Sequence, residues 1–331
     1  MSSADAVAVV LWAGVSAYAV FGGADFGAGL WRLLVADSHP DAERIRGRID
    51  RSIGPVWEAN HVWLIFALVV LWTGFPIAFT ALMENLYLPL ALAALGIVLR
   101  GSAFAFAGAF EGSLRGRLGI LFGISSVLTP FFMGTVVGAV ANGSVVAGET
   151  PGPFEAWLAP LPLLVGALFV LSGAYLAAVF LVDDARRAEE VDLIAYFRRL
   201  ALLAAGVAGV VAVAGLAVLS SDAPFVYDGL TSEGLPLLVG SLLAGGAALA
   251  AIWRGASRLT RPLAVVAVIA VIWGWGVAQH PYLLPETTSV DAAAADPATL
   301  SALLVFAAVA AVVVGPSMLL LFRLAQRRVL E

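Results

Sequence analysis

Nine long apolar stretches follow one another along this chain, with short connections between them. A helix that crosses a bilayer needs about 20 mostly apolar residues. Because lipid offers no hydrogen-bond partners, every backbone N–H and C=O must be paired within the chain, and such stretches fold as helices. The sequence therefore predicts an all-α integral membrane protein with nine transmembrane helices, in one polytopic domain over residues 1–331. The predicted spans are residues 6–34, 54–79, 82–110, 118–141, 157–182, 199–219, 235–253, 262–279 and 300–322.

Arginines mark every second connection between these stretches. All 18 basic residues are arginine, and every one except Arg100 lies in or beside the first, third, fifth or seventh connection, or after the last span. Connections rich in basic residues stay on the cytoplasmic side. One span more or fewer would break this alternation. The pattern therefore predicts an N-terminus outside and a C-terminus inside.

The composition excludes several classes of function. Lysine and cysteine are absent, which excludes lysine-based phosphate loops, Schiff bases, disulfides, iron–sulfur clusters and thiolate haem ligation. Charged residues make up 12%, about half of what a soluble chain carries. No basic block suits nucleic acid. The chemistry must come from the few polar residues within the spans.

Three charged residues fall inside predicted spans, namely Asp25, Glu58 and Arg100. Such residues are costly in lipid and are functional candidates by default. Asp25 and Glu58 each lie seven residues from an arginine at the inner end of their span, or roughly 10 Å. Their spans run in opposite directions, so both carboxylates are expected at a similar depth. Asn60 and His61 extend this polar group outward from Glu58.

Two interpretations of these residues remain open. Carboxylates and a histidine can carry protons, which favours a proton-conducting or ion-coupling site that opens toward the inside. Alternatively, Asp25 or Glu58 pairs with Arg100 and locks neighbouring helices together. A proton-coupled secondary transporter would use the same charges, but it often shows internal repeats, and no second copy of the Glu58 segment is found.

The histidines give little support to a metal or haem site in this chain. His39 and His280 are expected on opposite sides of the membrane, so neither pairs with His61 as bis-histidine haem ligands at one depth. A haem held by His61 and a methionine is not favoured either. Glu58 and His61 form half of a di-iron motif, which needs a second copy and two more glutamates. We expect no metal here.

The segment Ile53–Leu64, with the sequence IGPVWEANHVWL, resembles the signature of subunit II of the cytochrome bd-type quinol oxidases. The resemblance extends over most of the chain. Other stretches similar to that family are Tyr18–Gly29, Phe75–Pro89, Leu99–Phe104, Ser126–Val140 and Trp273–Pro285. In many members an acid stands where this chain has Gly22, so the first helix keeps only Asp25 of a frequent acidic pair.

This resemblance implies a fold and a role in respiration. The fold would be two four-helix bundles, residues 6–141 and 157–279, plus a peripheral helix at 300–322. The chain would be the non-haem subunit, without catalytic residues of its own, in the bacterial cytoplasmic membrane. A haem-bearing subunit I would hold b-type haems and, in some members, haem d, and the complex would oxidise quinol and reduce O2 to water.

The resemblance also implies residue roles. Glu58 occupies the position of an acid that lies on a proton path from the cytoplasm. Asp25, Asn60, His61 and Arg100 are the other expected residues of this path. Some members hold a structural quinone in this subunit, but no residue of this chain is assigned to one.

Overall fold

The computed structural model describes residues 2–53, 57–107, 109–110, 112–255 and 259–326, and most of them are helical, which confirms the all-α prediction. The long helices are α1 (Ser3–Leu34), α3 (Trp57–Gly74), α5 (Tyr87–Ala107), α6 (Gly112–Ala141), α7 (Pro160–Arg187), α8 (Val191–Asp222), α10 (Leu235–Arg254), α11 (Thr260–Gln279) and α13 (Pro297–Gln326). The short helices are α2 (Ala42–Ile53), α4 (Pro76–Asn85), α9 (Pro224–Thr231) and α12 (Val290–Ala293). Strands β1 (Tyr282–Leu284) and β2 (Thr288–Ser289) pair antiparallel.

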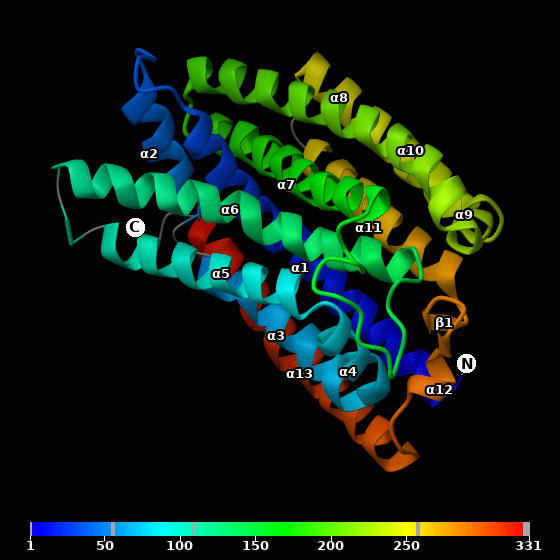
Figure 1. Ribbon diagram of the computed structural model, residues 1–331. Helices are drawn as coiled ribbons and strands as arrows, with labels where there is room; N and C mark the ends of the chain where they lie inside the picture. The colour runs from blue at the N-terminus through cyan, green and yellow to red at the C-terminus, as the bar shows by residue number, and fades with distance from the viewer. Residues whose placement is uncertain (1, 54–56, 108, 111, 256–258, 327–331) are drawn as a thin grey trace.

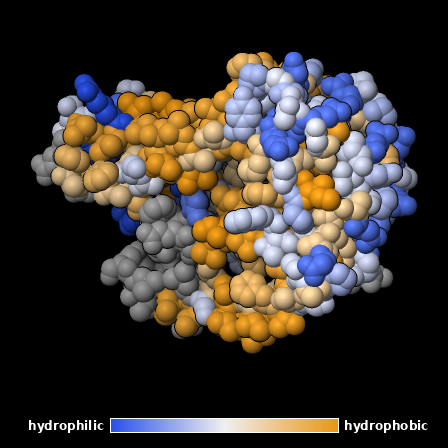
Figure 2. Space-filling model, turned by 60° about the horizontal axis from the view of Figure 1, so that its bottom comes forward, coloured by the Kyte–Doolittle hydropathy of each residue, from blue (hydrophilic) through white to orange (hydrophobic). Residues whose placement is uncertain are grey.

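Within the described ranges, eight helices are long and apolar enough to cross a membrane. A ninth crossing is obtained only if α3 and α4 count as one span, and these two helices are bent by 115° at their junction. Large apolar side chains such as Ile65, Val210 and Val312 lie 60%, 71% and 74% exposed. Figure 2 shows hydrophobic residues over much of one face, with hydrophilic residues gathered mainly at the right of that view. These surfaces suit lipid or another apolar protein surface.

The bend after α3 corrects two predicted span boundaries. The predicted spans 54–79 and 82–110 ran through this region, whereas α3 ends at Gly74 and α5 begins at Tyr87. Pro76 has no N–H to donate and disfavours a helical conformation at Phe75, which takes φ −136° and ψ 63°. The chain therefore leaves α3 and starts the separate helix α4, whose last residue Asn85 is buried and hydrogen-bonded to the 142–159 connection.

Several helices continue beyond their predicted spans. Helix α6 begins at Gly112 instead of residue 118, and α8 begins at Val191 instead of residue 199. Arginines that the sequence placed in connections therefore lie on helical turns, as Arg186 and Arg187 do in the last turn of α7. Charged residues end an apolar stretch but do not end a helix, because arginine is a good helix former.

The first connection folds into the amphipathic helix α2. Its residues Ile45, Ile49 and Ile53 recur every four positions and are buried in the core that α1, α7 and α8 also build. On the polar face, Arg48 Nε donates to Glu190 Oε2 at 2.7 Å. This hydrogen bond holds the pKa of the Glu190 carboxyl below its ordinary value. Helix α2 thus joins the end of α1 to the α7–α8 connection.

Helix α1 packs closely against α7 because glycines remove the side chains between them. A Cβ added at Gly27 would stand 2.0 Å from the carbonyl oxygen of Gly173. Trp31 Nε1 donates to the Ala174 carbonyl at 2.7 Å in the same interface. Figure 1 shows α1, α6 and α7 running along one another. Since α1 contacts helices of both predicted halves, the division into two four-helix bundles stays a prediction.

We expect Gly27→Ala to destabilise the protein by about 1–3 kcal/mol or more, because backbone atoms of α7 occupy the space that the new methyl group needs. The loss is measured as a lower midpoint of thermal unfolding in detergent. Gly206→Ala on α8 is the matched control, because a Cβ there meets nothing within 4 Å. Equal midpoints for both variants would contradict the close α1–α7 packing.

Candidate functional site: a buried ion pair and the polar residues beside it

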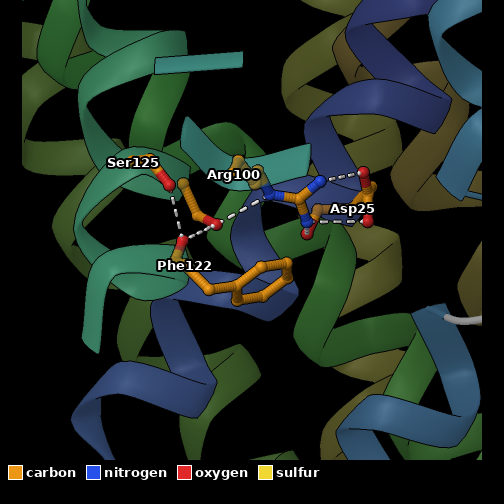
Figure 3. A network of polar contacts seen from close by, with 5 residues as sticks. Asp25, Arg100, Phe122 and Ser125 are labelled. Carbon is orange, nitrogen blue, oxygen red and sulfur yellow. Dashed lines mark hydrogen bonds and ion pairs between the residues drawn. The ribbon is translucent and has the colours of Figure 1, made fainter. Parts of the chain in front are cut away.

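Arg100 and Asp25 form an ion pair inside the helical core. Arg100 Nη1 lies 2.7 Å from Asp25 Oδ2, and Nη2 lies 2.9 Å from Oδ1, so the contact is bidentate. Nη2 also donates to the Asp25 carbonyl at 3.1 Å. Each of the two side chains is 2% exposed. Figure 3 shows the guanidinium facing both carboxylate oxygens.

A third helix completes the hydrogen bonding of Arg100. Its Nε donates to Ser126 Oγ on α6 at 2.8 Å, and this hydroxyl in turn donates to the Phe122 carbonyl at 2.5 Å. Gly29 on α1 makes this approach possible, because a Cβ there would stand 2.2 Å from Ser126 Oγ. The pair therefore ties α1, α5 and α6 together.

Aromatic rings cover the guanidinium. Its central carbon lies 4.4 Å from the ring centroid of Phe122 and 4.9 Å from that of Phe26. Such cation–π contacts stabilise a desolvated guanidinium. A buried ion pair offsets its loss of hydration only when its geometry is good and its remaining polar atoms are satisfied. This pair meets both conditions.

The ion pair corresponds to the second interpretation of the sequence, in which Asp25 pairs with Arg100 and locks neighbouring helices together. Both Asp25 oxygens are engaged by the guanidinium, so the pair presents a fixed, compensated charge. The arrangement ties α1, α5 and α6 together. A role of Asp25 and Arg100 in proton transfer stays a prediction.

The structure brings the His61 ring of α3 against α1, and Asn60 precedes it in the same turn. The His61 ring lies 6.3 Å from the Tyr18 ring and 6.1 Å from the Phe26 ring, edge-on to both. Asn60 is 3% exposed, and its Oδ1 has no hydrogen-bond partner among the described residues. Phe26 thus lies between His61 and Arg100 and contacts both of these predicted residues.

The Glu58 side chain lies outside the described residues. Its backbone belongs to the first turn of α3, three residues before His61. The predicted depth match between Glu58 and Asp25 is therefore not tested at the carboxylates. The contact of Gly14 on α1 with Phe66 and Ala67 on α3 fixes the backbone register between these two helices.

No group of three histidine, cysteine, aspartate or glutamate side chains that could hold a metal comes together among the described residues. His280 lies 3.5 Å from Asp5 and is 59% exposed, while His39 contacts Tyr196 in another part of the fold. The described residues thus offer no bis-histidine haem site.

Sequence reasoning assigned no role to Phe26, Phe122, Ser126 or Tyr18. A buried arginine needs up to five acceptors or aromatic faces, and this requirement alone predicts such neighbours. The spacing along each helix does not say which residues supply them, because they come from different helices.

Comparisons with known proteins agree on one family. The family model of cytochrome bd terminal oxidase subunit II matches residues 4–325. The putative cytochrome bd menaquinol oxidase subunit II of Bacillus subtilis is 24% identical over 96% of this chain and 94% of its own length. The cytochrome bd ubiquinol oxidase subunit 2 of the same organism is 30% identical over 38% of this chain and 37% of its own.

A solved structure, that of bd oxidase from Geobacillus thermodenitrificans, contains a chain with the same fold. The TM-score is 0.78, with 24% identity, and the match covers 98% of each chain.

We expect Asp25→Asn to lower the free energy of unfolding by about 3–5 kcal/mol, because it leaves the Arg100 guanidinium buried without its counter-charge. Denaturant or thermal unfolding in detergent measures the loss. Asp50→Asn is the control, since Asp50 pairs with Arg32 at 2.7 Å but is 47% exposed and should contribute about 0–1 kcal/mol.

The double variant Asp25→Leu, Arg100→Met should recover part of the lost stability, because no charge is then left unpaired. An Asp25→Asn variant as stable as Asp50→Asn would argue against a stabilising ion pair.

Proposed function

The chain belongs to the cytochrome bd terminal oxidase subunit II family, and we propose that it is the non-haem subunit of a quinol oxidase, supporting a haem-bearing subunit I and supplying part of its proton path. The match over residues 4–325 is the observation that carries this proposal. The two Bacillus subtilis relatives are named for menaquinol and for ubiquinol, so we propose a quinol without specifying which.

The reaction requires protons at the site where oxygen is reduced. Quinol oxidation releases two protons and two electrons, and the reduction of one O2 to two waters takes up four of each. The haems of the partner subunit would supply the electron transfer. The residues of this chain would hold helices in place and move protons.

The ion pair supports the scaffolding role. Arg100, Asp25 and Ser126 join three helices by charge-assisted hydrogen bonds within an apolar core. Such bonds resist sliding of one helix along another, because any displacement leaves a charge unpaired. The apolar exposed faces of α3, α8, α10 and α13 would be covered by lipid and by subunit I.

The polar side of α3 supports the proton path. Glu58 lies in the first turn of this helix, Asn60 and His61 follow it, and the His61 ring lies against α1. A carboxylate beside a histidine can accept a proton and pass it on. The compensated charge of Arg100 lies beyond the Phe26 ring and would not capture the proton.

The arginines support an orientation. Helix α2 and the adjoining ends of α7 and α8 carry eight of the 18 arginines. The positive-inside rule would place this end in the bacterial cytoplasm, with the N-terminus outside. Glu58 would then take its protons from the cytoplasmic side.

We expect Glu58→Gln to slow quinol-driven oxygen uptake by roughly 100-fold at matched haem content, because glutamine cannot take up a proton. The measurement uses the purified complex with its haem quantified by absorbance. Glu84→Gln on α4 is the control, since this acid lies outside the proposed path.

Uptake by Glu58→Gln equal to that of the unaltered complex would exclude Glu58 from the path. Loss of haem or of the partner subunit in this variant would instead point to a structural role of Glu58.

A further inference from the structure

Three buried polar atoms on α1 and α3 have no hydrogen-bond partner among the described residues. They are the hydroxyl of Tyr18, Oδ1 of Asn60 and Nε1 of Trp63. Tyr18 as a whole is 9% exposed and Asn60 is 3% exposed. Native proteins leave few buried polar groups unpaired, and each such group calls for an explanation.

The register between the two helices brings the residues that carry these atoms to neighbouring levels of the α1–α3 interface. A Cβ at Gly14 would lie 2.8 Å from Phe66 and 3.6 Å from Ala67, while the Tyr18 ring lies 6.3 Å from the His61 ring. Moving forward along α1 thus moves backward along α3. Tyr18 is level with the turn of α3 that carries Asn60 and Trp63.

The Tyr18 side chain extends along α1 toward the ion pair. A Cβ added at Gly22 would stand 2.7 Å from the Tyr18 ring, so the ring lies across this glycine. It also meets the Phe26 ring edge-on at 6.4 Å. The Tyr18 hydroxyl is therefore directed along the α1–α3 interface and away from lipid.

Water is the partner whose chemistry suits all three atoms. Trp63 Nε1 only donates, Asn60 Oδ1 only accepts, and the Tyr18 hydroxyl does both. Water molecules donate and accept in the same way and often satisfy buried polar groups. All three atoms are buried within the chain.

We propose that Tyr18, Asn60 and Trp63 bind water between α1 and α3, and that the Tyr18 hydroxyl is a proton-transfer residue of the oxidase. The inference rests on the proposed function, because it extends the path that begins at Glu58. A proton arriving on the bound water forms a new bond to the Tyr18 oxygen, while the original O–H bond breaks and its proton goes to a second water molecule. The tyrosine ends the step neutral, and no oxidant or reductant is needed.

Tyr18→Phe in the whole oxidase complex tests the proposal, because it removes the hydroxyl and keeps the ring. We expect oxygen uptake about tenfold slower at matched haem content, the size that corresponds to one lost hydrogen bond. The solvent deuterium isotope effect on uptake should rise, because proton transfer becomes rate-limiting.

Tyr175→Phe is the matched control. Tyr175 on α7 is also buried, and its hydroxyl likewise has no partner among the described residues. It lies in the core of α7, outside the proposed path. Uptake and isotope effect should stay unchanged in this variant.

The outcomes separate this inference from the proposed function. Normal uptake in Tyr18→Phe together with slow uptake in Glu58→Gln would overturn the role of Tyr18 and leave the path through Glu58. Slow uptake and a raised isotope effect in Tyr18→Phe with normal Glu58→Gln would support Tyr18 and remove Glu58. Equal slowing in Tyr18→Phe and Tyr175→Phe would assign the effect to packing and overturn the inference.

Asn60→Leu provides a second test that does not alter Tyr18. It keeps the shape of the side chain and removes the acceptor for the bound water. Slower uptake with a raised isotope effect supports the proposal, and unchanged uptake at normal haem content overturns it.

Discussion

The bidentate contact between Arg100 and Asp25 is the interaction on which the arrangement of the helices depends. A full positive charge in an apolar core has to meet its counter-charge and satisfy its remaining donors. Arg100 does so through Asp25 on α1 and Ser126 on α6, with Phe26 and Phe122 against its faces. The positions of three helices follow from this one requirement.

Close packing of backbones makes that contact possible. Gly29 admits the Ser126 hydroxyl, and Gly27 admits the backbone of Gly173 on α7. In a chain whose surface is mostly apolar, burial of apolar surface does not distinguish one helix pairing from another. Glycine contacts and the ion pair supply the specificity, and the buried face of α2 adds a contact at one end of the bundle.

The unpaired polar residues of α1 and α3 have a different character from the ion pair. Arg100 and Asp25 satisfy one another, whereas Asn60, Tyr18 and Trp63 hold polar atoms that no described protein group satisfies. A saturated pair is suited to holding helices, and an unsaturated group is suited to binding water. Phe26 lies between the two regions and contacts both. The proposed scaffold and the proposed path are thus adjacent but chemically distinct.

The sequence alone determined the all-α membrane class, the family, and Asp25 and Arg100 as charges within long apolar helices, because apolar length, arginine placement and long motifs are local properties. The tertiary structure decided the bend at Phe75 and Pro76, the partner of Arg100, and the nearness of Tyr18 to His61. These depend on which helix faces meet, and hydropathy says nothing about that when lipid and protein are equally apolar.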